Sequence, residues 1–275
     1  MGNSNDEAED WSCCNDSQSL FILFYVAFAG ITLVLGNSLV LKPMRLITVF
    51  IHEMSHAVAC WLTCGNVMQL QVYENEGGVT KYIGGCRCLI IPAGYVGASF
   101  FGMIFVILSG GRKTATFAAA SFTFSLLFAL CYSPNRVMVY LCLGYAVVTL
   151  SFIFVEWYWY TPILQFVILF YGVFIGMFAI SDIYSDTIVR SVQGSDAYAC
   201  SHEVWTCCSP QVVGLQWAIL AIFFQLFGIW IALVEMSEEC EDLGWFQCIH
   251  LTIDLDDFEL GGDKWDFDGF WDQDR

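Results

Sequence analysis

Residues 157–181, WYWYTPILQFVILFYGVFIGMFAIS, contain no charged side chain. A helix needs about 20 apolar residues to cross the hydrocarbon core of a bilayer, and this run contains an apolar segment of about that length. The same holds for five further charge-free runs, and together these runs predict a chain that crosses a membrane several times. They cover residues 17–41, 88–111, 114–135, 137–155 and 204–234.

The composition of the whole chain agrees with a membrane location. Hydrophobic residues make up 57% of the 275 residues and charged residues only 13%, whereas soluble domains carry about 25% charged residues. Mean hydropathy is +0.63. The segment Arg45–Cys64 is a further candidate span, although it holds two histidines and a glutamate. We therefore expect an all-α polytopic membrane protein with about six or seven transmembrane helices.

One stretch after residue 65 does not have a helical pattern. Residues 67–73 alternate apolar and polar side chains, which is the periodicity of a β-strand. Residues 74–78 have turn composition and residues 79–83 are typical of a second strand. We therefore expect a short β-hairpin at the membrane edge, over about residues 67–83. The helices are expected at about residues 19–41, 44–64, from 89 onward, 114–132, 137–155, 160–180 and 211–234, with a polar connector at 181–210.

The charge pattern divides the chain into three parts. Residues 1–18 form an acidic leader, residues 19–235 the transmembrane domain, and residues 236–275 an acidic tail with interspersed aromatic residues. The net charge of −17 repels nucleic acid, so we expect no nucleic-acid partner. A solvated, disordered tail is typical of this composition, and a docking motif for a protein partner is the alternative.

The 13 cysteines leave at least one thiol unpaired within a single chain. Several lie near predicted membrane edges, including Cys86 and Cys88. These cysteines could form disulfides in a lumenal compartment or be palmitoylated in the cytosol, and the sequence does not decide between the two.

Chemistry is concentrated in the segment His52-Glu53-Met54-Ser55-His56. Positions i and i+4 of a helix share one face, so His52 and His56 can direct two imidazole nitrogens at one Zn²⁺. Glu53 would lie beside the ion and move protons to and from a zinc-bound water. Ionisable groups within a membrane span are costly and usually functional. The alternatives are a buried polar cluster between helices and a zinc site without catalysis.

A third ligand is expected from another part of the chain, because a catalytic zinc usually has three protein ligands. Aspartates near the membrane are few: Asp182, Asp186 and Asp196. Ser181-Asp182 and Ser195-Asp196-Ala197 are both candidates, and the sequence pattern alone does not choose between them.

These residues resemble the site-2 protease-like intramembrane zinc metallopeptidases, and in particular the small branch found in fungi, plants and bacteria. The resemblance covers roughly residues 45–235. It rests on Phe50-Ile51-His52-Glu53-Met54-Ser55-His56-Ala57, on Gly77-Gly78-Val79-Thr80 and on Pro92-Ala93-Gly94-Tyr95-Val96-Gly97.

The resemblance implies that His52 and His56 are zinc ligands, that Glu53 is the general base, and that a later aspartate is the third ligand. Family members usually carry this aspartate in an Asp-Gly motif, whereas Ser195-Asp196-Ala197 is the closest analogue here. We therefore prefer Asp196 as the third ligand and keep Asp182 in reserve.

The expected activity is hydrolysis of peptide bonds in membrane-anchored proteins, with Zn²⁺ as cofactor and a transmembrane protein as substrate. A transmembrane helix satisfies its backbone hydrogen bonds internally, so it must unwind before hydrolysis. The strand around Leu70 is expected to hold the unwound segment by β-augmentation.

Two other functions are compatible with parts of the sequence. A non-catalytic zinc-binding multi-span adaptor or pseudoprotease, acting through the acidic tail, is the alternative. A transporter fits less well, since the polar groups cluster in one helix and no inverted repeat is evident. We expect an integral multi-pass protein of an endomembrane, although the sequence does not identify the organelle or the orientation.

Overall fold

The computed structural model describes residues 16–159, 163–189 and 194–236. The predicted acidic leader, except for its last residues, and nearly all of the predicted tail lie outside the described residues. The described chain forms eight α-helices and one two-stranded antiparallel sheet, which confirms the predicted fold class. The helices are α1 (Asp16–Leu35), α2 (Lys42–Leu62), α3 (Arg87–Leu108), α4 (Arg112–Ala129), α5 (Arg136–Trp159), α6 (Leu164–Tyr184), α7 (Asp196–Glu203) and α8 (Pro210–Glu235), and the strands are β1 (Asn66–Val72) and β2 (Gly78–Ile83).

Six of the described helices are long and apolar enough to cross a membrane: α1, α3, α4, α5, α6 with its extension, and α8. The helix α2 is not among them. It contains Lys42, Arg45 and the motif residues, and it lies inside the bundle against α3 and α6. Most of its residues are buried, so neighbouring helices cover its polar groups.

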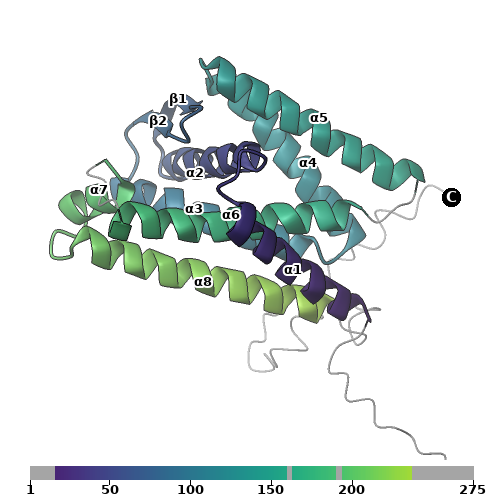
Figure 1. Cartoon of the computed structure of the whole chain (residues 1–275). Coiled ribbons are helices and arrows are strands. Elements are labelled where there is room, and N and C mark those ends of the chain that lie inside the picture. The colour runs from purple at the N-terminus through teal and green to yellow at the C-terminus, as the bar shows by residue number, and fades with distance from the viewer. Residues whose placement is uncertain (1–15, 160–162, 190–193, 237–275) are drawn as a thin grey trace, which may run out of the picture.

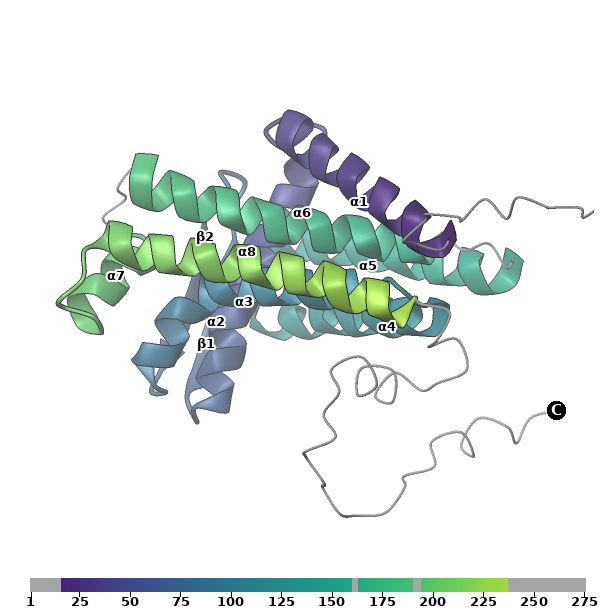
Figure 2. The same ribbon diagram turned by 90° about the horizontal axis from the view of Figure 1, so that it is seen from below.

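The helices are arranged in layers around α3 and α6. The helix α8 packs along one side of this pair, and α5 lies on the opposite side (Figures 1 and 2). Figure 2 shows α2 crossing the direction of α6 and α8, and in Figure 1 the hairpin lies above α2. The short helix α7 lies beside the start of α8 and contacts α3.

Glycines allow α3 and α6 to approach closely. A Cβ atom on Gly102 of α3 would lie 2.8 Å from the backbone nitrogen of Gly176 and 3.0 Å from the carbonyl oxygen of Gly172, both in α6. Small residues are typical of membrane helix contacts, because they let backbones approach within van der Waals distance. This contact fixes α3, which forms one wall of the candidate site.

The first helix ends earlier than the hydrophobic run predicted. It stops at Leu35 rather than near Leu41. The carbonyl oxygens of Gly36 and Ser38 instead accept hydrogen bonds from Nη1 of Arg45, at 2.6 and 2.9 Å. A buried guanidinium therefore satisfies the backbone groups that a longer helix would have paired internally.

The second helix starts and stops at residues that the sequence marks. Pro43 occupies its first turn, where its missing N–H costs nothing. Cys64 then takes a left-handed φ of 60°, and the N–H of Gly65 donates to Cys60 O at 2.8 Å. A Cβ atom on Gly65 would lie 2.4 Å from the Cys60 sulfur, so glycine is needed at this position.

The hairpin confirms the predicted strand pair with small changes at its ends. Leu70 pairs with Thr80, and the register is irregular between Val67 and Gln69. The inner residues of β1, including Leu70 and Val72, are buried in the core. Strand β2 alternates half-buried and exposed residues, so it remains more accessible than β1.

The segment between the last two spans differs from the expected polar connector. The helix α6 continues to Tyr184 and is followed by a π-helical turn, Ser185–Val189. The connector also contains α7, whose N-cap residue Ser195 accepts a hydrogen bond from the N–H of Tyr198 at 3.3 Å. An eight-residue polar helix has little hydrophobic periodicity, which explains why the sequence pattern did not predict it.

Candidate metal centre

The helix α2 places two imidazoles on one face. His52 and His56 lie four residues apart, and their Nε2 atoms are 3.1 Å apart. The rings meet nearly at right angles, with centroids separated by 4.8 Å. His56 is buried and His52 is half-buried. The spacing expected from the sequence therefore directs both nitrogens at one point.

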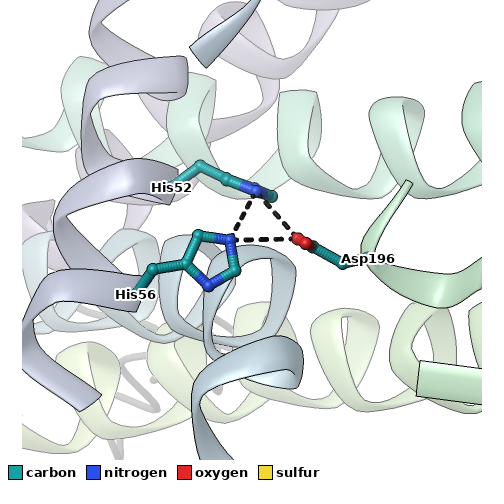
Figure 3. Close-up of side chains that lie close together, drawn as sticks. All are labelled: His52, His56 and Asp196. Atoms are coloured by element: carbon teal, nitrogen blue, oxygen red, sulfur yellow. Dashed lines mark hydrogen bonds and ion pairs between the residues drawn. The ribbon is translucent and has the colours of Figure 1, made fainter. Parts of the chain in front are cut away.

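Asp196 reaches the same point from a segment far away in the sequence. It is the first residue of α7, and its Oδ2 lies 3.0 Å from Nε2 of His52 and 3.1 Å from Nε2 of His56. Figure 3 shows the three side chains converging from two elements. Among the described residues, these three form the only group of His, Cys, Asp and Glu side chains arranged to hold a metal ion. Asp182 lines the same cavity but does not belong to the group.

A backbone carbonyl fixes the orientation of His56. Its Nδ1 lies 2.7 Å from Ile90 O in the first turns of α3. A carbonyl only accepts, so Nδ1 carries the proton and donates it. In the neutral ring, Nε2 then presents a lone pair. This arrangement is typical of metal-ligating histidines, whose second nitrogen usually donates to a carbonyl or carboxylate.

The donor atoms fit a small cation. Oδ2 of Asp196 is buried, and apart from the two imidazole nitrogens beside it the described residues give it no hydrogen-bond partner. Without a metal ion, burial raises the pKa of Asp196, but protonated imidazoles of His56 and His52 would hold this pKa well below its usual range. Zinc–ligand distances of about 2.0–2.1 Å imply neighbouring donor atoms about 3.3–3.4 Å apart, so each separation between these three atoms needs to widen by only about 0.3 Å. A cation also removes the repulsion between three converging electron pairs.

Glu53 lies beside the histidines and contacts the hairpin. It is buried, and the hydroxyl of Thr80, which has one hydrogen to donate, lies 2.6 Å from Oε2 of Glu53 and 2.9 Å from its carbonyl oxygen. A Cβ atom on Gly78 would lie 2.3 Å from Oε1. Strand β2 therefore packs directly on the Glu53 side chain and holds it by the hydroxyl of Thr80.

The helix α3 covers the imidazoles from the other side. A Cβ atom on Gly94 would lie 2.4 Å from Nε2 of His52 and 2.5 Å from Nε2 of His56. The ring of Tyr95 stands edge-on to His52 with centroids 4.6 Å apart, and its hydroxyl donates to Oδ2 of Asp186 at 2.5 Å. Glycine at position 94 thus lets α3 approach the ligand atoms, and Tyr95 supports His52.

These groups share a cavity of about 430 Å³. His52, Glu53, His56 and Asp196 line it, together with residues 77–80 of the turn and β2. Leu70, the residue expected at the centre of a substrate-binding strand, is 1% exposed and does not line this cavity. The strand facing the candidate metal centre is β2.

The geometry defines a group of three side chains that could hold a metal ion, with the carboxylate of Glu53 beside it. A family model described as Peptidase M50B-like matches residues 24–231, and the chain belongs to this family. The membership confirms the resemblance to site-2 protease-like peptidases and identifies a metallopeptidase family whose members are embedded in membranes. No curated protein and no solved structure matched the chain.

Several contacts of the site were not predicted from the sequence. Ile90 acts through its carbonyl, which every residue has, and Gly94 acts by lacking a side chain. Thr80 belongs to the segment Gly77-Gly78-Val79-Thr80 that carries the family resemblance, and the resemblance implies no role for it. The hydrogen bond from Thr80 to Glu53 depends on how the hairpin packs against α2, and no local sequence pattern predicts it.

Proposed function

We propose that the protein is an intramembrane zinc metalloendopeptidase that hydrolyses peptide bonds of membrane-anchored proteins. The observation that carries the proposal is the convergence of His52, His56 and Asp196 to within 3.0–3.1 Å beside the buried carboxylate of Glu53. His52, His56 and Asp196 would hold the ion.

When bound, Zn²⁺ supplies Lewis-acid polarisation of the scissile carbonyl and lowers the pKa of water. Glu53 accepts the proton of the attacking water and delivers it to the nitrogen of the leaving amine. Thr80 orients the Glu53 carboxylate through its hydroxyl. The Ile90 carbonyl keeps the Nδ1 proton of His56 in place, so that Nε2 stays free of a proton.

Strand β2 is the proposed docking site for the unwound substrate. β1 is covered by α2 and by neighbouring elements, and Asn135 Nδ2 donates to Val72 O at 2.8 Å. Within the described residues β2 pairs only with β1, and its residues Val79 and Thr80 line the cavity. An extended segment that adds to β2 would bring its amide bonds beside Glu53.

The test uses the full-length protein and Glu53→Gln, which removes the base but keeps the shape of the side chain. Membranes of cells that express either form are compared for new peptide termini by mass spectrometry. We expect termini within or next to transmembrane segments that depend on the wild-type protein, and a loss of about 10²–10⁴-fold in the variant. Both forms should bind zinc equally.

Equal cleavage by the Glu53→Gln variant would rule out the proposed mechanism. Wild-type membranes without such termini, together with stoichiometric zinc, would instead favour a zinc-binding protein without peptidase activity. The matched variant Glu74→Gln changes an acidic residue of the hairpin turn that does not line the cavity. It should cleave as the wild type does.

A further inference from the structure

Two cysteines at the start of α3 lie close together. Cys86 is the N-cap residue of this helix and Cys88 is in its first turn, and both side chains are exposed. Their sulfur atoms are 2.7 Å apart, about 0.7 Å longer than a disulfide bond of about 2.05 Å. Cys86 has extended backbone angles (φ −94°, ψ 103°) while the following residues are helical. The pair therefore needs only a small movement to bond.

Cys86 is also placed to react. The pKa of its thiol lies below the ordinary value, chiefly because Cys88 hydrogen-bonds to its sulfur, with a smaller contribution from the backbone N–H groups of Cys88 and Leu89. The thiolate is the nucleophile in thiol–disulfide exchange. Its exposure makes it accessible to a small disulfide.

The first turns of α3 make three contacts with the two helices that carry the candidate ligands, α2 and α7. The N–H of Cys86 donates to Oγ1 of Thr63 at the end of α2, at 3.0 Å. Arg87 forms an ion pair with Glu203 at the end of α7, at 2.8 Å. Ile90 O, two residues after Cys88, holds Nδ1 of His56. A change in this turn therefore reaches both helices that carry the ligand side chains.

We infer that Cys86 and Cys88 form a redox-active dithiol whose oxidation state sets the metal affinity of the centre through the first turns of α3. Glutathione disulfide represents the class of oxidant. The Cys86 thiolate attacks one of its sulfurs, forming a mixed disulfide and releasing one glutathione thiolate. The Cys88 thiolate then attacks the Cys86 sulfur and releases the second, and the two cysteine protons pass to the two glutathione thiolates. The coupling to metal affinity rests on the proposed function, whereas the disulfide does not.

The experiment uses purified full-length protein in detergent, equilibrated in glutathione buffers of defined ratio. Free thiols are alkylated and the protein is digested with chymotrypsin, which leaves residues 86–88 in one peptide. The mass of this peptide reports the oxidation state of the two cysteines. A chromophoric chelator competing for zinc reports the dissociation constant of each form. We expect the peptide to lose two hydrogens on oxidation. We also expect the zinc dissociation constant to rise about tenfold, which is the lower end of the 10- to 100-fold range typical when a hydrogen-bond partner of a metal ligand is disturbed.

Two variants serve as controls. In Cys88→Ser, Cys86 should stop at the mixed disulfide with glutathione, with no internal bond. The double variant Cys207→Ser/Cys208→Ser removes the other close thiol pair, whose sulfurs are 3.7 Å apart, and should behave as the wild type does.

Thiols at 86 and 88 that stay reduced in the most oxidising buffer, or that bond to Cys207 or Cys208, would overturn the dithiol. An internal bond with an unchanged zinc dissociation constant would overturn the coupling. A wild type that holds no zinc in either state would refute the proposed metal centre and the coupling with it, while the peptide mass still decides the disulfide separately.

Discussion

At the scale of single residues, Gly94 has the most restricted position in the site. The Cβ atom of any other residue there would lie 2.4–2.5 Å from Nε2 of both His52 and His56, well inside van der Waals contact. The absence of a Cβ atom lets α3 cover the ligand atoms while Tyr95, the next residue, supports the His52 ring. Residues that coordinate nothing thus decide whether the ligands can meet.

Gly94→Ala should abolish zinc binding in a protein that still folds. The new methyl group must displace at least one imidazole, because a Cβ atom would lie 2.4–2.5 Å from the ligand nitrogens. Zinc content and far-UV circular dichroism of the purified variant check this. Gly144→Ala in α5 is the matched control, since nothing lies within 4 Å of its added methyl group. Full zinc content in Gly94→Ala would show that α3 does not confine the imidazoles as described.

Thr80 provides a second prediction at this scale. Thr80→Val keeps the shape of the side chain and removes the hydroxyl that donates to Glu53. Cleavage should fall between about 10- and 100-fold because the base loses its orientation, whereas zinc content should not change. Thr80→Ser restores a hydroxyl and should recover most of the rate. If Thr80→Val and wild type cleave at the same rate, Glu53 is not positioned by β2.

At the scale of elements, the two strands of the hairpin have different surroundings. β1 faces the core and β2 faces the cavity, so a substrate segment should contact β2. A photoreactive amino acid at Val79, in the Glu53→Gln background, should crosslink to membrane proteins that wild-type protein cleaves. Met68 of β1 is exposed but lies outside the cavity. The same photoreactive group at Met68 should not crosslink to these proteins. Crosslinks of equal yield from both positions would argue against docking on β2.

The limits of sequence-based prediction are also clearest at this scale. Hydropathy predicted the spanning helices, because each needs a long apolar run regardless of its neighbours. Strand periodicity predicted the hairpin to within a few residues. It did not distinguish the strand that faces the cavity, since this depends on how α2 and α5 cover β1. The helix α7 was missed because only its cap, Ser195, marks it.

The site residues were predictable to different degrees. His52 and His56 lie four residues apart, so their spacing alone predicts a shared face of the helix, and Glu53 is adjacent to His52 in the sequence. Asp196 lies far along the chain, and it was preferred over Asp182 only by resemblance to a family motif. The structure brings Asp196 to both imidazoles. No local rule could have given this, because it depends on how α7 packs against α3 and α8.

At the scale of the whole molecule, the contact between α3 and α6 supports the bundle. Gly102→Ala places a methyl group 2.8–3.0 Å from backbone atoms of α6, which cannot rotate away. The free energy of unfolding should fall by about 1–3 kcal/mol, as is typical of overpacking. Thermal unfolding in detergent measures the change, with Gly144→Ala again as the control. Equal melting temperatures for the two variants would mean that α3 and α6 are less closely packed than described.

The proposed function requires one zinc ion held between α2 and α7. The metal content of purified wild-type protein, measured by mass spectrometry beside Asp196→Ala and Glu53→Gln, tests this directly. We predict about one zinc per chain in the wild type and in Glu53→Gln, and little in Asp196→Ala, because catalytic zinc sites rely on three protein ligands. Wild-type protein without stoichiometric metal, or Asp196→Ala that binds zinc as tightly as the wild type does, would contradict the account.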